Sequence, residues 1–117
     1  EILGIEINKD SIKNAKLNKK LNNINNIDFI CTDAKNIHDK YDTVLVDPPR
    51  NGLSKQVIKK LLEIRPEKII YTSCNPNTLK RDIELLETNY KTIEITPVNM
   101  FPKTSHVECV CLLETIW

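Results

Sequence analysis

Short apolar runs and amphipathic segments alternate along the chain. Strands are predicted at residues 2–7, 27–31, 42–47 and 68–73, where apolar residues cluster. Helices are predicted at about 10–21, 54–63 and 77–86, where apolar residues recur at helical spacing. Two more strands are predicted near 90–98 and 107–115. This order favours a mostly parallel sheet with helices on both faces and an antiparallel strand closing one edge.

Polar residues predict where the helices begin and end. Asp10 is expected to cap the first helix and Ser54 the second, because their side-chain oxygens can accept from free backbone N–H groups. The stretch "NNINN" at 22–26 is expected to end the first helix. The apolar residues expected on one face of the first helix are Ile12, Ala15, Leu17 and Leu21. Those of the third helix are Leu79, Ile83 and Leu86.

Length and composition are those of an ordinary globular protein. The chain has 117 residues, 40% of them hydrophobic and 28% charged, with a net charge of +1, which favours one soluble domain over a disordered or fibrous chain. No apolar run approaches the roughly 20 residues that span a bilayer, and no signal peptide is recognisable, so no membrane is expected and the cytoplasm is the predicted location. The lysines at helical spacings, expected to lie on solvated faces, are Lys16, Lys19, Lys20, Lys55, Lys59 and Lys60.

The four cysteines fall into different settings. None has the spacing of a zinc site, so no metal is expected. Cys109 and Cys111 alternate within a predicted strand and are expected to pack as small apolar residues. Cys74 instead follows a strand, within "YTSCNP" at 71–76, and precedes a helix whose N-terminus favours a thiolate. From these features alone, a nucleophile and an inert thiol remain equally open.

Carboxylates accompany Cys74 at the predicted strand ends. Glu6, Asp33 and Asp47 all fall at or just beyond the carboxyl end of a predicted parallel strand, which is where such sheets bind ligands. Glu6 is placed to accept both hydroxyls of a ribose, although a merely solvated carboxylate fits equally well. Pro48 and Pro49 lack backbone donors and fix φ, so they can hold Asp47 in a rigid loop or simply stop a strand.

The last strand brings a further candidate. His106 and Glu108 lie two residues apart and therefore point to one face of it. Glu108 can act as a general base, and a solvated carboxylate is the alternative.

Together these segments resemble one enzyme family. The motifs "DPPRNG" at 47–52, "YTSCNPNTLKRD" at 71–82 and "MFPKTSHVECV" at 100–110 resemble those of the RNA uracil-5-methyltransferases, which form 5-methyluridine in transfer or ribosomal RNA with S-adenosylmethionine. The stretch from Gly4 to Ala34 is similar to the second and third strands of the family's cofactor-binding sheet. The resemblance covers essentially the whole chain, in order.

The resemblance implies a role for each candidate. Cys74 is the implied nucleophile, which adds to uracil C6, and Glu108 is the implied base. Glu6 is the implied ribose ligand, and Asp33 and Asp47 are further cofactor-pocket residues, Asp47 also facing the uracil. The target uridine is expected in an RNA loop or flipped out of its stack. Residues expected to do no more than support the site are Arg50, Asn75 and His106.

The resemblance also implies a Rossmann-like class I methyltransferase sheet that lacks its first strand and helix. That region of the family carries a glycine-rich cofactor loop, and neither Gly4 nor Gly52 belongs to one. Residues 1–117 are therefore expected to be the carboxyl-terminal part of a catalytic domain, with the RNA-binding portion upstream. A gap or abnormal pairing is expected where the first strand belongs. We expect the isolated chain to be nearly inactive and to associate through free strand edges.

Two other functions remain open. An amino-group methyltransferase can use an Asp-Pro-Pro loop like the one at Asp47 to hold a planar base, and it needs no covalent cysteine. A non-catalytic RNA-binding domain of the same fold would bind no cofactor.

Overall fold

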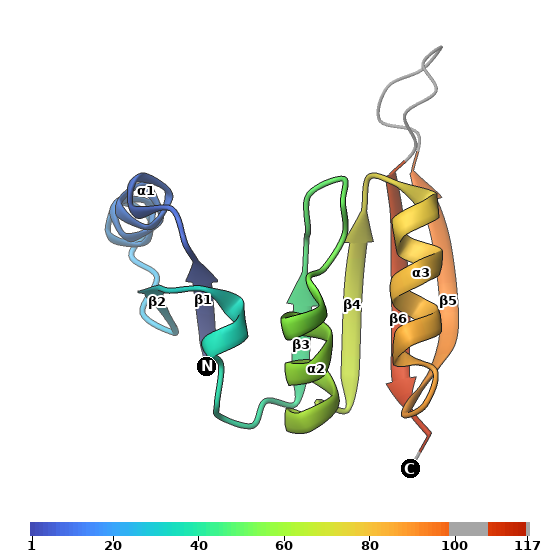
Figure 1. The fold of residues 1–117 in the computed structure, drawn as a ribbon. Helices are drawn as coiled ribbons and strands as arrows, with labels where there is room; N and C mark the ends of the chain where they lie inside the picture. The colour runs from blue at the N-terminus through green and yellow to red at the C-terminus, as the bar shows by residue number, and fades with distance from the viewer. Residues whose placement is uncertain (99–107, 117) are drawn as a thin grey trace. The chain divides into compact units, whose positions relative to one another are not determined.

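The fold consists of two compact units, residues 1–37 and 38–117 (Figure 1). The computed structural model describes residues 1–98 and 108–116. Each unit has its own sheet and is considered by itself. That both belong to one catalytic domain stays a prediction.

The first unit is a parallel strand pair with one long helix. Its elements in chain order are β1 (Ile2–Glu6), α1 (Lys9–Leu21), β2 (Ile27–Cys31) and a 3-10 helix (Ala34–Asn36). Ile2 lies opposite Ile27, and Glu6 lies opposite Cys31. The carboxyl ends of the two strands therefore lie side by side.

Helix α1 begins at Lys9, one residue earlier than the sequence predicts. Asn8 is the N-cap, and its Oδ1 accepts from the N–H groups of Asp10 and Ser11 at 2.9 and 3.0 Å. The prediction of Asp10 as the cap was wrong, because Asp10 lies inside the first turn, where its charge favours the helix dipole instead. At the other end Asn22 caps the helix and Asn23 takes a left-handed φ of 53°, so the predicted stop is confirmed.

The buried face of α1 is narrower than predicted. Ile12 is buried, whereas Leu17 and Leu21 are 52% and 69% exposed. A sheet of two strands offers only a narrow apolar strip, so the outer part of the expected face has nothing to cover within this unit.

The second unit is a four-stranded sheet with two helices. Its elements are β3 (Thr43–Val46), α2 (Lys55–Ile64), β4 (Lys68–Ser73), α3 (Pro76–Leu86), β5 (Tyr90–Val98) and β6 (Glu108–Thr115). The strand order is β3-β4-β6-β5, with β3 and β4 parallel and β6 antiparallel to both its neighbours. The terminal strand is thus antiparallel as predicted, but it lies inside the sheet, and β5 closes the edge.

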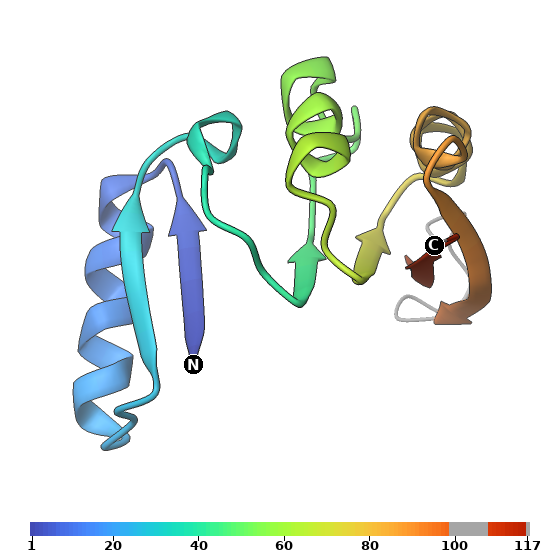
Figure 2. The same cartoon turned by 90° about the horizontal axis from the view of Figure 1, so that it is seen from below.

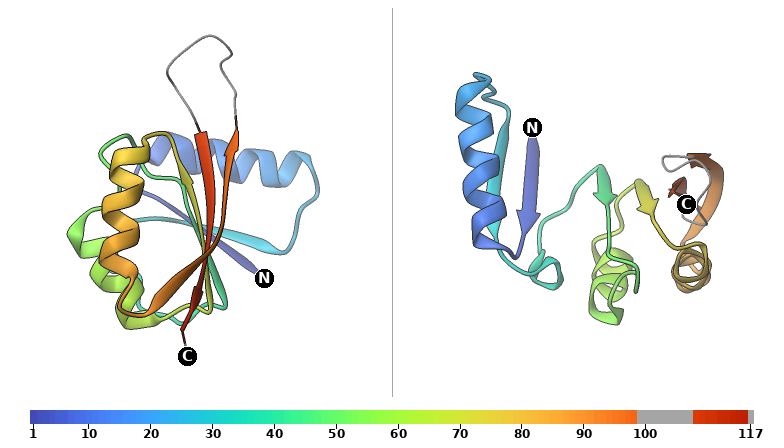
Figure 3. Two further views of the ribbon diagram at one scale, coloured as in Figure 1. Left: turned by 90° about the vertical axis from the view of Figure 1, so that its right-hand side faces the viewer. Right: turned by 90° about the horizontal axis from the view of Figure 1, so that it is seen from above.

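Helices α2 and α3 both pack on one face of this sheet, as Figures 2 and 3 show. The sequence predicts helices on both faces of one sheet built from the whole chain, which this unit alone does not test. Ser54 caps α2 by accepting from the N–H of Val57 at 3.2 Å, as expected. The core under the helices consists chiefly of Leu61, Ile69, Tyr71, Leu86, Tyr90 and Leu113.

Among residues 1–98 and 108–116, β1 pairs with β2 alone and β3 with β4 alone. A break at this place in the strand order is what the resemblance implies. None of the helices in these residues has the length and apolar content needed to cross a membrane.

Candidate functional site

Three of the predicted site residues lie at the ends of neighbouring strands in the four-stranded sheet. Asp47 directly follows β3, which runs parallel to β4, and Cys74 directly follows β4. Glu108 begins β6, which runs antiparallel to β4 with Ser73 opposite Cys109. Cys74 and Glu108 are the next residues in the chain beyond this last pair. The sheet therefore brings a thiol and two carboxylates to the ends of three neighbouring strands.

The turn that carries Cys74 is fixed by its two neighbours. Ser73 is 3% exposed, and its Oγ accepts from the N–H of Asn75 at 3.0 Å and donates to the carbonyl of Asn75 at 2.9 Å. Asn75 then caps α3 by accepting from the N–H of Asn77 at 3.0 Å. Cys74 is half-buried and stands outside the strand, next to the start of this helix.

Cys111 has an environment that contrasts with that of Cys74. Cys111 is fully buried in β6, and burial raises the pKa of its thiol, so it stays protonated and packs as an apolar group. All four cysteines are free. Within the described part of the chain, no group of three or more His, Cys, Asp or Glu side chains is arranged to hold a metal ion.

Glu108 lies half-buried at the start of β6, opposite Val98 of β5. The segment that leads into it, residues 99–107, lies outside the described residues. The predicted neighbours Phe101 and His106 belong to that segment. Within the described residues, the position of Glu108 is set by the pairing of β6 with β5 and β4.

The loop that carries Asp47 is fastened to helix α3. Asp47 itself is exposed. Further along, the carbonyl of Arg50 accepts from Asn75 Nδ2 at 3.0 Å and from Thr78 Oγ1 at 2.9 Å. Asn75 follows Cys74 directly. Its side chain therefore links the turn that carries Cys74 to the loop that carries Asp47, which agrees with a supporting role.

A buried carboxylate that sequence reasoning missed lies below this loop. Asp82 is 0% exposed and accepts from the N–H of Leu53 at 2.8 Å, from Tyr71 Oη at 2.6 Å and from Arg81 Nε and Nη2 at 3.0 and 2.8 Å. Burial, and then the hydrogen bond to Asp82, raises the pKa of Tyr71 well above its usual value, so the phenol stays a donor.

Asp82 rather than Ile83 occupies the buried face of α3 together with Leu79 and Leu86. The sequence carried a signal for it, because residue 82 has helical spacing with both leucines.

The contacts of Arg81 and Asp82 with this loop require glycine at position 52. Its φ is +75°, and a Cβ there would lie 2.6 Å from Arg81 Nη2 and 2.7 Å from Asp82 Oδ2. We expect Gly52→Ala to lower the free energy of unfolding by roughly 2 kcal/mol, since both the left-handed backbone and the crowding oppose it. Urea unfolding measures this. Asn51→Ala, at the exposed neighbouring residue, is the control, and an equal loss in both variants would contradict the prediction.

The remaining two predicted residues lie together in the first unit. Glu6 ends β1 and is exposed, and its Oε1 accepts from the N–H of Asn8 at 3.3 Å. Asp33 follows β2, and its Oδ1 caps the short 3-10 helix by accepting from the N–H of Lys35 at 3.0 Å. The structure therefore forms two groups, one in each unit. That they serve one cofactor stays a prediction.

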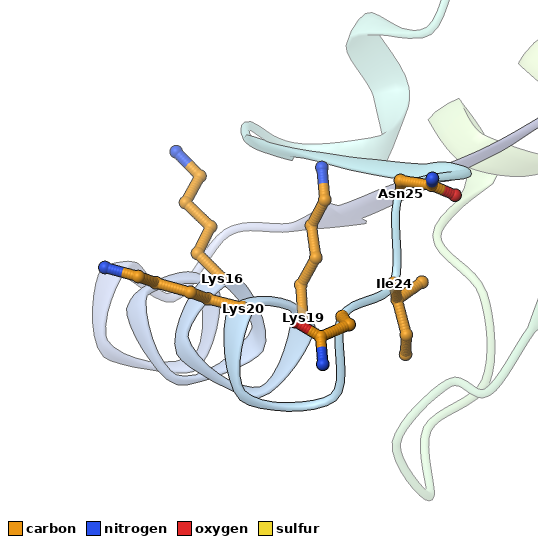
Figure 4. A pocket seen from close by; sticks show the side chains of 6 residues that line it. Lys16, Lys19, Lys20, Ile24 and Asn25 are labelled. Atoms are coloured by element: carbon orange, nitrogen blue, oxygen red, sulfur yellow. The ribbon is translucent and has the colours of Figure 1, made fainter.

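A shallow pocket in the first unit lies at the carboxyl end of α1 and contains none of these residues. Its lining residues are Lys16, Lys19, Lys20, Asn23, Ile24 and Asn25. Figure 4 shows the lysine amino groups spread apart rather than directed at one point. Lys19 pairs with Asp28 at 3.3 Å. This agrees with the predicted solvated face.

Comparison with known proteins assigns the family. The family model described as tRNA (uracil-5-)-methyltransferase matches residues 36–116, which is most of the chain. The chain belongs to this family. The matched region includes Asp47, Cys74 and Glu108.

Relatives of the family match nearly the whole chain. An RNA methyltransferase of Enterococcus faecalis is 46% identical over 97% of this chain and 26% of its own length. One from Bacillus cereus is 40% identical over 99% of this chain and 27% of its own length. The chain thus spans about a quarter of the length of these relatives.

Solved structures share the fold. The tRNA (uracil-54, C5)-methyltransferase of Pyrococcus abyssi, in complex with S-adenosyl-L-homocysteine, matches with a TM-score of 0.88 and 38% identity, over 95% of this chain and 28% of that one. The N-methyltransferase NodS of Bradyrhizobium japonicum matches with a TM-score of 0.79 at 13% identity, over 98% of this chain and 66% of that one, which shows the fold alone. The predicted Rossmann-like class I methyltransferase fold is confirmed.

Proposed function

We propose that this family member methylates C5 of an RNA uridine through a covalent bond between Cys74 and uracil C6. The observation that carries the proposal is that Asp47, Cys74 and Glu108 lie at the ends of the three neighbouring strands β3, β4 and β6. The likeness to the P. abyssi enzyme, whose name specifies C5 of uracil 54, supports this chemistry over amino-group transfer.

The first step belongs to Cys74. Uracil C5 is a weak nucleophile, so the thiolate adds to C6 and turns C5 into an enolate-like carbon. Cys74 is half-buried and lies outside the strand, which favours access of a ring to it, whereas Cys111 is fully buried. The target base has to leave its stack for this contact, which favours a loop or flipped-out uridine in a transfer or ribosomal RNA.

The cofactor proposed for this site is S-adenosylmethionine. When bound, it supplies the electrophilic methyl group that C5 accepts. The carboxylates present fit such a group, because they only accept hydrogen bonds and ribose hydroxyls donate them. Glu6 is exposed at the end of β1, so its oxygens are accessible to both hydroxyls. Asp33 and Asp47 would hold other parts of the cofactor, with Asp47 also facing the uracil.

The last step belongs to Glu108. After methylation C5 still carries its proton, and a base has to remove it before the C6–sulfur bond can break. The proton passes to the carboxylate, the electron pair reforms the C5–C6 double bond, and Cys74 leaves as the thiolate. The pairing of Ser73 with Cys109, next to Cys74 and Glu108 in the chain, supports a role for both side chains on one uracil ring.

The experiment that tests the proposal uses the full-length protein with 5-fluorouridine RNA and S-adenosylmethionine. Fluorine replaces the C5 proton, so elimination cannot occur and the methylated base stays bound. We expect mass spectrometry of the digested complex to map the adduct to Cys74. An adduct on another residue, or none from a protein that methylates normal RNA, would contradict the proposal.

We also propose that these 117 residues alone transfer little or no methyl group. A separate proposal is that the full-length protein acts in the cytoplasm. Neither glycine of the chain forms a glycine-rich cofactor loop: Gly4 lies in β1 and Gly52 in the loop before α2. Four free thiols fit a reducing compartment.

The isolated chain is also expected to associate with itself. Strand β3 pairs on one side only within the described residues, and Leu45 on it is 73% exposed. A free strand edge with an apolar side chain favours pairing with another copy. Sedimentation velocity at high protein concentration should therefore show dimers or larger species, and Leu45→Glu should shift them toward monomer. A wild-type chain that stays monomeric would refute this.

A further inference from the structure

We propose that Arg81 and Asp82 are positioning residues for methyl transfer, which hold the loop 47–54 against helix α3 and so fix Asp47 relative to Cys74. The inference rests on the function proposed above. Neither residue is placed in contact with the substrate. Their effect would pass through the backbone of residues 51–53, which they bind directly.

The carboxylate of Asp82 is placed where a charge is costly. It is fully buried, and such a charge is tolerated only when its oxygens are satisfied. Oδ2 accepts from the backbone N–H of Leu53 and from Tyr71, and Oδ1 accepts from Arg81 twice. An apolar side chain would often serve stability equally well, but it could not hold the N–H of Leu53 in one direction.

Arg81 binds the same loop through its guanidinium group. Its Nη2 donates to Asp82 Oδ1 at 2.8 Å, to the carbonyl of Asn51 at 2.9 Å and to the carbonyl of Leu53 at 3.2 Å. Its Nε adds a second bond to the same carboxylate oxygen. The planar guanidinium can make these bonds together, whereas lysine would keep the charge and lose the fork. The loop is thus bound at an N–H and at two carbonyls by one ion pair.

A second fastening ties the same loop to the cysteine turn. The carbonyl of Arg50 accepts from Asn75, the residue after Cys74, and from Thr78. The backbone of residues 50, 51 and 53 is therefore held by side chains of α3 and its cap. The loop starts at Asp47, and the helix starts next to Cys74. Because reacting groups displaced by about 1 Å can lose roughly 100-fold in rate, this rigidity bears directly on turnover.

The experiment compares Arg81→Lys and Asp82→Asn with wild type in the full-length protein. We expect kcat to fall about 10- to 100-fold in Arg81→Lys while KM for the RNA changes by less than about threefold, because orientation is lost and binding is kept. Adduct formation with 5-fluorouridine RNA should slow by a similar factor. Hydrogen exchange at the Leu53 amide should become faster in both variants.

The matched control is Ile69→Val, a buried residue at the start of β4 that does not contact the loop through any of these bonds. It should lower the melting temperature and leave kcat per folded molecule unchanged. If Arg81→Lys loses activity only in proportion to its unfolded fraction, as this control does, or if Leu53 exchange is unchanged, the inference is overturned. Arg81→Lys decides the question even where Asp82→Asn fails to fold. A wild-type protein that forms no 5-methyluridine would instead overturn the proposed function.

Discussion

Cys74→Ala is expected to abolish methyl transfer, lowering turnover of a uridine RNA on the order of 10⁴-fold or more. Without the thiolate, C5 has no route to enolate character, and no other residue of the turn offers a comparable nucleophile. The side chain is half-buried and outside the strand, so its loss should leave the fold intact. Transfer of a labelled methyl group in the full-length protein measures the effect, with calorimetry checking that cofactor affinity is retained.

Cys109→Ala is the matched control, because it removes the same atom from the neighbouring strand, opposite Ser73. It should keep activity close to that of wild type. The alternatives give different results in Cys74→Ala. An amino-group methyltransferase would retain activity, and a non-catalytic RNA-binding domain would show neither activity nor cofactor binding in the wild-type protein. Either pattern would refute the covalent mechanism.

The strand pattern could be predicted because each strand carries its own local signal. Residues 68–73 alternate buried and less buried positions and form β4 with the predicted bounds. The order of the strands could not be predicted as well. That β6 lies between β4 and β5 depends on long-range pairing.

Helix faces were predicted less well, for a related physical reason. Periodicity shows which residues share one face of a helix. It does not show how wide the sheet is against which that face packs. Leu17 and Leu21 fit the expected stripe of α1 and are exposed, because the sheet below has two strands. The predicted face of α3 held Leu79, Ile83 and Leu86, and Asp82 was missed, since a carboxylate is expected on a buried face only when its partners are known.

For the candidate site, too, the residues could be predicted from the local sequence, whereas their arrangement in space could not. Each of Cys74, Asp47 and Glu108 was found from its place next to a predicted strand. Their proximity depends on register, which the structure supplies through the pairing of Val46 with Tyr71 and of Ser73 with Cys109. The hold exerted by Arg81 was not foreseen, because its acceptors are backbone carbonyls of residues 28 and 30 positions away.

Glu108→Gln is expected to stop the reaction after methylation rather than before it. The amide cannot take the C5 proton, so the C6–sulfur bond persists and turnover should fall about 10²- to 10⁴-fold. A normal uridine RNA should then remain covalently attached to Cys74, without any fluorinated analogue. The complex should survive denaturing electrophoresis, and its RNA should carry the new methyl group. Cys74→Ala would show no such complex, so the two variants divide the reaction at the methylated adduct.

The control for this variant is Glu114→Gln at the other end of β6, where Glu114 lies opposite Lys68 and 4.0 Å from its amino group. An exposed pair of this kind contributes little, so the variant should release methylated RNA normally. If Glu108→Gln turns over like wild type, the base is another residue. If it is inactive and forms no adduct, Glu108 acts before methylation, on the base or on the thiol. A methylated, attached RNA is the one outcome that requires the carboxylate to remove the C5 proton, since only that step separates the adduct from the product.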